Sequence, residues 1–147
     1  MLRVVQVFVS GIVLAGITLA GVSEASAQEP EKPVLTLDGD AAVVTILIKP
    51  DKTADFESVV AKLKEALAKS EKAERKQQLA GLKVFKSNQL AQGNAVYIFI
   101  VDPVVKGQEY DITRLVAEVF PVEVQEVFAK YRDSFAGRAI ASLTKVP

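Results

Sequence analysis

Runs of apolar residues predict three strands in the middle of the chain. Residues 41–49 read Ala-Ala-Val-Val-Thr-Ile-Leu-Ile-Lys, a mainly β-branched and large apolar run in which only Thr45 and the last residue are polar. Such a run predicts a strand in the interior of a sheet. An alternating run predicts a second strand over Leu82–Ser87, and a continuous apolar run predicts a third over Ala95–Asp102. The short connection between these two favours an antiparallel hairpin.

Helical spacing follows the first strand. Between Thr53 and Lys69, apolar residues recur at intervals of one, three and four positions and form a single stripe, at Phe56, Val59, Val60, Leu63 and Leu67. This pattern predicts an amphipathic helix whose stripe packs against a core. The charged stretch Ser70–Ala80 that follows is expected to be a short solvated helical turn or a loop.

Two further helices are expected near the end of the chain. Asp111 can cap a helix over Ile112–Phe120, and Pro121 separates this helix from the next. The next helix has an apolar stripe at Val124, Val127, Phe128, Tyr131 and Phe135. Gly137 predicts its end, and residues 139–146 have the weak pattern of a last strand.

The order of these elements indicates a fold class. Strand, helix, strand, strand, two helices and strand is the split β-α-β arrangement of ferredoxin-like folds. We therefore expect an α+β domain with a four-stranded antiparallel sheet and its helices on one face. Phe85, Tyr97 and Phe99 are expected to lie in phase on the other face. A bare aromatic face is usually covered, which predicts a homodimer that pairs through the open face of the sheet.

The first 40 residues divide into two parts. Residues 1–27 combine a positive start, an uncharged stretch and the small residues Ala25-Ser26-Ala27, which predicts a signal peptide and a periplasmic or secreted protein. An uncleaved anchor is the alternative, because the uncharged stretch approaches the length of a membrane span. Residues 28–40 are expected to be a tether whose apolar part is an edge strand or an ordered tail, and residues 41–147 to be the domain.

The composition excludes several chemistries. The chain has no histidine and no cysteine. A histidine-based triad, a thiolate nucleophile, histidine-bound haem and the usual zinc and copper sites are therefore excluded. Its 18 basic and 18 acidic residues balance, which argues against general binding to nucleic acid or to anionic membranes. No cofactor, no metal site and no catalytic residue is predicted.

Three features are shared with a known family: the element order, the strand–Pro–helix run Ile48–Phe56 and the split final helix. In these, residues 41–146 resemble the dimeric α/β-barrel superfamily, which includes antibiotic-biosynthesis-type monooxygenases and stress-responsive barrel proteins. The resemblance implies two subunits whose sheets pack into a barrel, with a pocket beside each sheet. The haem-degrading members rely on histidine-bound haem, which this chain cannot supply. No catalytic role carries over to a residue of this chain.

Five residues are candidate ligand contacts. Tyr97 and Phe99, with Phe85, either line an apolar pocket or pack in the core and at a dimer contact. Tyr110, just before the expected helix cap, either meets a ligand or covers the edge of the sheet. Lys83 shares a face with Phe85 and either binds an anion or extends to solvent.

Three functions remain open. We favour a non-catalytic exported module that binds a small apolar ligand or dimerises, because no acid–base pair at a defined spacing is visible. A cofactor-independent monooxygenase- or isomerase-like enzyme is the alternative, and a closed apolar pocket containing tyrosine or lysine would favour it. The third function is a protein–protein adaptor in the cell envelope.

Overall fold

The computed structural model describes residues 31–147. The expected signal peptide, residues 1–27, lies outside the described residues. The strands are β1 (Ala41–Ile48), β2 (Leu82–Lys86), β3 (Ala95–Val101) and β4 (Phe135–Leu143). The helices are α1 (Thr53–Lys69), α2 (Ala73–Gly81), α3 (Ile112–Val119) and α4 (Val124–Ser134), and a single 3-10 turn, η1 (Pro50–Lys52), precedes α1. Among these residues, no helix has both the length and the apolar character needed to cross a membrane.

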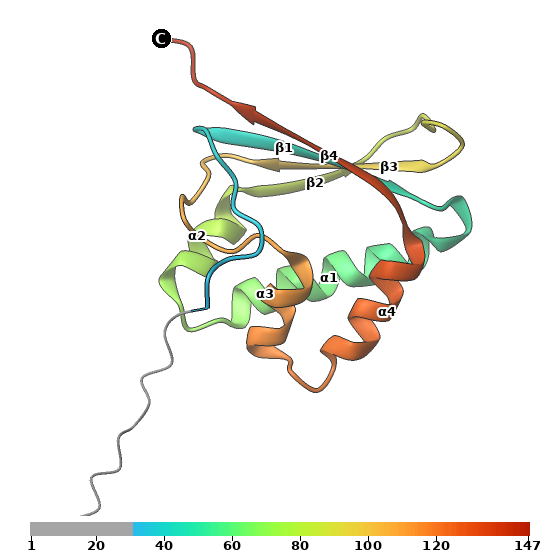
Figure 1. The fold of residues 1–147 in the computed structure, drawn as a ribbon, viewed down its shortest axis with the longest axis horizontal. Coiled ribbons are helices and arrows are strands. Elements are labelled where there is room, and N and C mark those ends of the chain that lie inside the picture. The colour runs from blue at the N-terminus through green and yellow to red at the C-terminus, as the bar shows by residue number, and fades with distance from the viewer. Residues whose placement is uncertain (1–30) are drawn as a thin grey trace, which may run out of the picture. The chain divides into compact units, whose positions relative to one another are not determined.

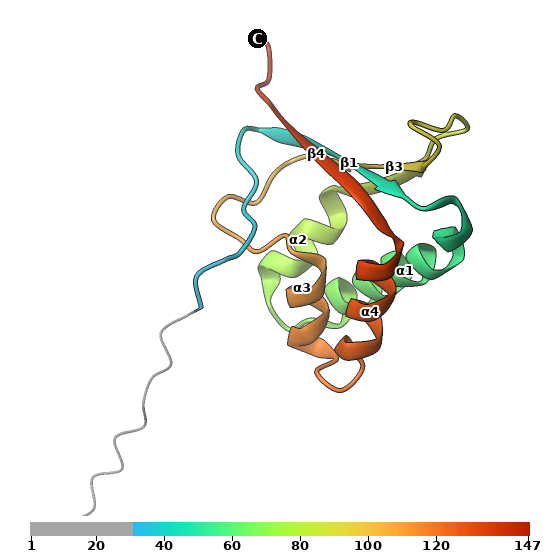
Figure 2. The same cartoon turned by 45° about the vertical axis from the view of Figure 1, so that its right-hand side comes forward.

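The four strands form one antiparallel sheet in the order β2-β3-β1-β4, as Figure 1 shows. All four helices lie on the same side of this sheet, and a second view agrees (Figure 2). The predicted α+β class is thus confirmed, and the strand order is consistent with a ferredoxin-like arrangement.

The core lies between β1, β3 and α1. In β1, alternate residues are buried against the helices, because successive side chains of a strand point to opposite faces. Val44 lies opposite Phe99 of β3 and Ile140 of β4. Phe56 of α1 is fully buried, and its ring centroid lies 4.8 Å from that of Tyr97 and 6.2 Å from that of Phe99. The stripe predicted for this helix therefore faces the sheet.

The prediction that the aromatic residues share the open face was wrong. Register places Tyr97 opposite Lys86 and Phe99 opposite Val84, whereas Phe85 lies opposite Ile98. Tyr97 and Phe99 therefore point toward the helices, and only Phe85 belongs to the open face. The strand pattern alone did not reveal this, because β3 is apolar on both faces.

The charged stretch after α1 contains a true helix rather than a solvated turn. Helix α2 buries Arg75 and Gln78, two polar residues, on its inner side. Arg75 donates to both carboxylate oxygens of Glu118 on α3, at 3.0 and 2.7 Å. Burial of this polar face is possible because Arg75 has an ionic partner 43 residues away along the chain. No local sequence pattern predicts such a partner.

The end of the last helix and the start of the last strand also differ from expectation. Helix α4 ends at Ser134, and β4 begins directly at Phe135. Gly137 therefore lies within a strand opposite Leu47, and it does not cap a helix. Phe128 and Phe135 are partly exposed, so neither belongs to a buried stripe. The pairing of β4 with β1 is a long-range contact that outweighs the local helical pattern.

The segment before β1 belongs to the compact unit, which starts at Lys32. Leu37 is only 3% exposed. The carboxylate of Glu109 accepts hydrogen bonds from the backbone N–H groups of Val34 and Leu35, at 2.7 and 3.0 Å. It also accepts the N–H groups of Tyr110 and Asp111. The apolar patch of the expected tether is thus an ordered tail, fixed by one carboxylate.

Candidate functional site

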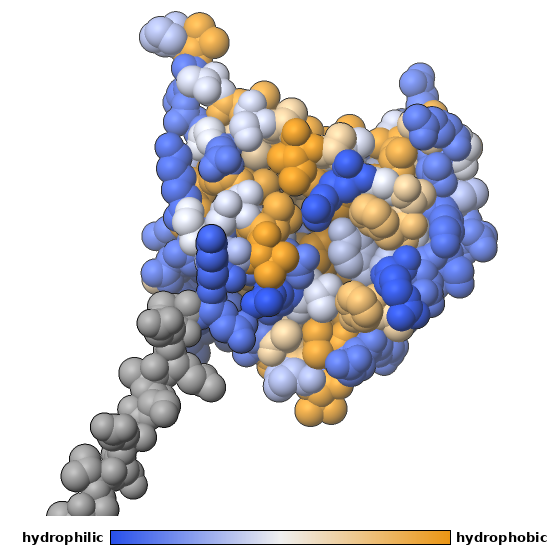
Figure 3. All heavy atoms as spheres, in the orientation of Figure 1, coloured by the Kyte–Doolittle hydropathy of each residue, from blue (hydrophilic) through white to orange (hydrophobic). Residues whose placement is uncertain are grey.

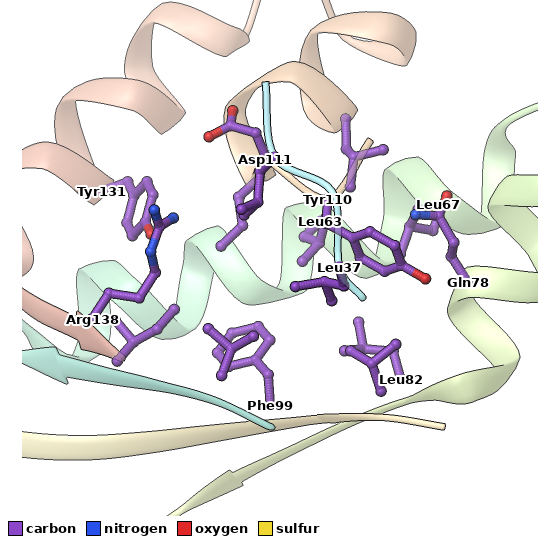
Figure 4. A pocket seen from close by; sticks show the side chains of 16 residues that line it. Leu37, Leu63, Leu67, Gln78, Leu82, Phe99, Tyr110, Asp111, Tyr131 and Arg138 are labelled. Atoms are coloured by element: carbon purple, nitrogen blue, oxygen red, sulfur yellow. The ribbon is translucent and has the colours of Figure 1, made fainter. Parts of the chain in front are cut away.

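A cavity lies between the helical side of the sheet and the helices (Figure 4). About 50 Å³ of it is open to the centre of a water-sized sphere, and one water needs roughly 10–15 Å³. Its walls come from the 35–37 tail, from all four strands and from α1 to α4, and most of the lining side chains are apolar. Leu37, Leu63 and Phe99 are among them.

Gln78 and Tyr110 lie together at one end of this cavity (Figure 4). The side-chain amide of Gln78 donates to the backbone oxygen of Glu109 at 2.7 Å and accepts from Arg75 at 2.8 Å. The hydroxyl oxygen of Tyr110 accepts the backbone N–H of Val105 at 2.8 Å. These hydrogen bonds hold both side chains in place at this end of the cavity.

Tyr131 of α4 and Arg138 of β4 lie beside one another at the other end (Figure 4), with Asp111 also on the cavity wall. Burial raises the pKa of Tyr131, the nearby Arg138 lowers it and Asp111 raises it, with a net rise. The phenol therefore keeps its proton at neutral pH. Asp111 caps α3, because its carboxylate accepts the backbone N–H of Arg114 at 3.0 Å.

A second hollow is an open groove between α1 and β2 that contains three interacting polar groups. The Tyr97 hydroxyl donates to Glu57 at 2.7 Å, and the Lys86 ammonium donates to the same oxygen at 2.9 Å. The hydrogen bonds from Tyr97 and Lys86 lower the pKa of Glu57, and burial and this bond raise that of Tyr97. One oxygen of Glu57 thus accepts from both neighbours, which holds the three side chains together at the groove.

The open face of the sheet is almost free of charge. Its residues, assigned by strand register, are Ala41, Val43, Thr45, Leu47, Lys83, Phe85, Val96, Ile98, Ile100, Gly137, Ala139, Ala141 and Leu143. Figure 3 looks across the sheet edge and shows apolar patches between charged residues on the side that carries β4, α3 and α4. The open face thus differs from the mixed surface around it.

The five predicted contacts do not form one site. Phe99 and Tyr110 line the cavity, whereas Phe85 and Tyr97 line the groove. Lys83 is exposed on the open face and lines neither hollow.

Sequence reasoning placed Tyr131 on the buried side of its helix but did not consider it as a site residue. It missed Arg138 altogether. A usable signal existed for Arg138, because it is a lone charge inside the apolar run Phe135–Leu143. Within residues 31–147, no group of three or more acidic side chains is arranged to hold a metal ion.

No family model, curated protein or solved structure matches this chain. The resemblance to the dimeric α/β-barrel superfamily therefore stays a prediction.

Proposed function

We propose that the protein is an exported, non-catalytic binding module that holds a small apolar molecule between its sheet and its helices. The cavity is the observation that carries this proposal, because it is bounded mainly by apolar side chains and has space left in it. Ligand sites are typically apolar hollows with a few polar groups that fix orientation. The signal-like residues 1–27 support the exported part.

The polar groups at the cavity favour binding over catalysis. General acid–base chemistry needs a group that can take up a proton near neutral pH. The guanidinium of Arg138 has donors and no acceptor, Tyr131 keeps its proton because burial raises its pKa, and the amide of Gln78 exchanges no proton in this range. The Asp111 carboxylate is already used as a helix cap. This donor set orients a ligand and does not form an acid–base pair.

Titration calorimetry with toluene, a small apolar probe, tests the proposal. The wild-type chain should bind toluene in a one-to-one complex. Leu115→Phe enlarges a residue of the cavity wall and should weaken this binding at least about tenfold, because packed interiors tolerate little extra volume. Leu90→Phe is the matched control, since Leu90 lies in the β2–β3 connection and is 66% exposed. Absence of binding, or equal binding by the wild type and Leu115→Phe, would overturn the proposal.

The open face of the sheet supports a second function, assembly with another copy of the chain. Only Lys83 on this face is charged, and it lies on the edge strand β2. Two copies packed face to face would place their apolar centres together and their lysines at the rim, as protein interfaces commonly do. Phe99 cannot report on this assembly because it is buried on the other side.

Sedimentation velocity measures the assembly directly. The wild-type chain should sediment as a dimer, and Ile98→Lys, at the centre of the open face, should sediment as a monomer. Leu90→Lys, in the neighbouring connection, should remain a dimer. A wild-type monomer at all concentrations, or an unchanged Ile98→Lys dimer, would contradict assembly through this face.

A further inference from the structure

Arg138 occupies an unusual position for a charged residue of this fold. It lies on the side of β4 that faces the helices, opposite Ile46 of β1, and it reaches the wall of the cavity (Figure 4). Within residues 31–147, no carboxylate lies within ion-pair distance of its guanidinium. By contrast, Arg75 pairs with Glu118 at 2.7 Å and Arg132 with Asp133 at 2.9 Å.

Tyr131 adds a second donor at the same place. Its ring packs 5.9 Å from that of Phe56, which fixes the side chain at the edge of the core. Its hydroxyl lies beside the Arg138 guanidinium (Figure 4). A guanidinium has five N–H donors and no acceptor, and a protonated phenol can donate as well. This end of the cavity therefore offers hydrogen-bond donors and positive charge to whatever enters.

We propose that the cavity binds a small monocarboxylate, with its compact apolar body among the cavity leucines and its carboxylate on Arg138 and Tyr131. This inference rests on the proposed binding function and names its ligand class. Guanidinium and carboxylate groups match in planar geometry and can form two parallel hydrogen bonds. Asp111, on the same wall, sets a limit, because its negative charge disfavours dianions such as phosphate esters.

Calorimetry with matched probes tests the charge of the preferred ligand. Benzoate and isovalerate carry a carboxylate, whereas benzamide and isovaleramide have nearly the same shape without the charge. At low salt, at least one carboxylate should bind about tenfold more tightly than its own amide. Arg138→Gln should abolish this preference and leave amide binding unchanged, and Tyr131→Phe should reduce the preference in part. Arg132→Gln is the control, because Arg132 is exposed and pairs with Asp133.

The outcomes separate the two proposals. Equal binding of carboxylates and amides would overturn the monocarboxylate inference and leave the apolar binding function intact. A preference for carboxylates that survives in Arg138→Gln would also overturn it, since the preference would then arise elsewhere. If toluene and all four probes fail to bind, both proposals fall together. Circular dichroism of the variants should match the wild type, because Arg138 is an exposed residue on an edge strand.

Discussion

The two faces of the sheet carry similar side chains and have different surroundings. Val43 and Val44 are neighbours on β1, yet Val44 is buried beneath the helices and Val43 is only partly buried on the open face. On β3, Phe99 packs against Phe56, whereas Ile98 lies on the open face and is only partly buried. Both faces are apolar, but only one has helices over it.

This difference separates two roles for the same type of residue. On the helical side, apolar residues form the core and line the cavity in which we propose that a small molecule binds. On the open side they form a flat, nearly uncharged surface of the kind that another protein covers. Apolar content alone therefore does not distinguish the two faces, whereas the position of the helices does.

A charge placed on each face in turn should give the largest difference in stability between the two faces. Val44→Asp buries an unpaired carboxylate and should lower the free energy of unfolding by more than about 4 kcal/mol. Val43→Asp leaves the carboxylate in contact with water and should cost no more than about 1 kcal/mol in the monomer. Urea unfolding at low protein concentration measures both changes. Equal losses would mean that the two faces are equally buried.

Removal of the buried ion pair between Arg75 and Glu118, on the helical side, should give the next largest loss of stability. Arg75 is 5% exposed, so Arg75→Met leaves Glu118 without its bidentate partner and should cost about 3 kcal/mol. Lys72 also contacts Glu118, at 3.2 Å, but its side chain is largely exposed. Lys72→Met should therefore cost less than about 1 kcal/mol. Thermal and urea unfolding of the two variants would show whether burial decides the difference, and similar costs would refute it.

The contribution of Glu109 to stability should depend on pH. Burial raises its pKa, but the four backbone N–H groups that it accepts outweigh burial and leave the pKa below its ordinary value. The stabilisation is therefore present above the unfolded pKa of about 4.3, and it is lost as the pH falls through the lower folded pKa.

Glu109→Gln should cost about 2 kcal/mol at pH 7, because the amide has one acceptor oxygen for these N–H groups. The difference from the wild type should shrink as the pH is lowered below about 4. Urea unfolding over a pH series measures this. A difference that stays constant to pH 3 would show that Glu109 does not act through its charge.

Truncation of a side chain on the open face should give the smallest loss of stability. Phe85 is 53% exposed, and Phe85→Ala should change the stability of the monomer by less than about 1 kcal/mol. The same truncation at Phe56, which is fully buried, should cost about 3–5 kcal/mol. Thermal unfolding of both variants measures the two losses of stability. A large loss of stability in Phe85→Ala would mean that the open face is part of the monomer core.

The parts of the fold that follow a local rule were predictable from the sequence. Strand β1 and helix α1 have continuous apolar patterns, and the structure places them almost as expected. Asp111 caps α3 through a hydrogen bond to a residue three positions along the chain, which is also a local signal. Local periodicity and capping residues therefore sufficed for most of the element order.

The site depended on distant contacts and was not predictable in the same way. Phe99 and Tyr110 were candidates and do line the cavity, but Arg138 reaches it only because β4 pairs with β1. The burial of Arg75 depends on Glu118, 43 residues later. The face assigned to Tyr97 failed because register, which the pattern of an all-apolar strand leaves open, decides which side each residue takes.

A methyl-labelled NMR titration with toluene tests the central claim most directly. The account predicts shifts for methyl groups that line the cavity, at Leu63, Leu67 and Leu115, and none for Val43 and Ile98 on the open face. Shifts confined to the open-face methyls, or no shifts at saturating toluene, would contradict the claim that the space between sheet and helices is the binding site.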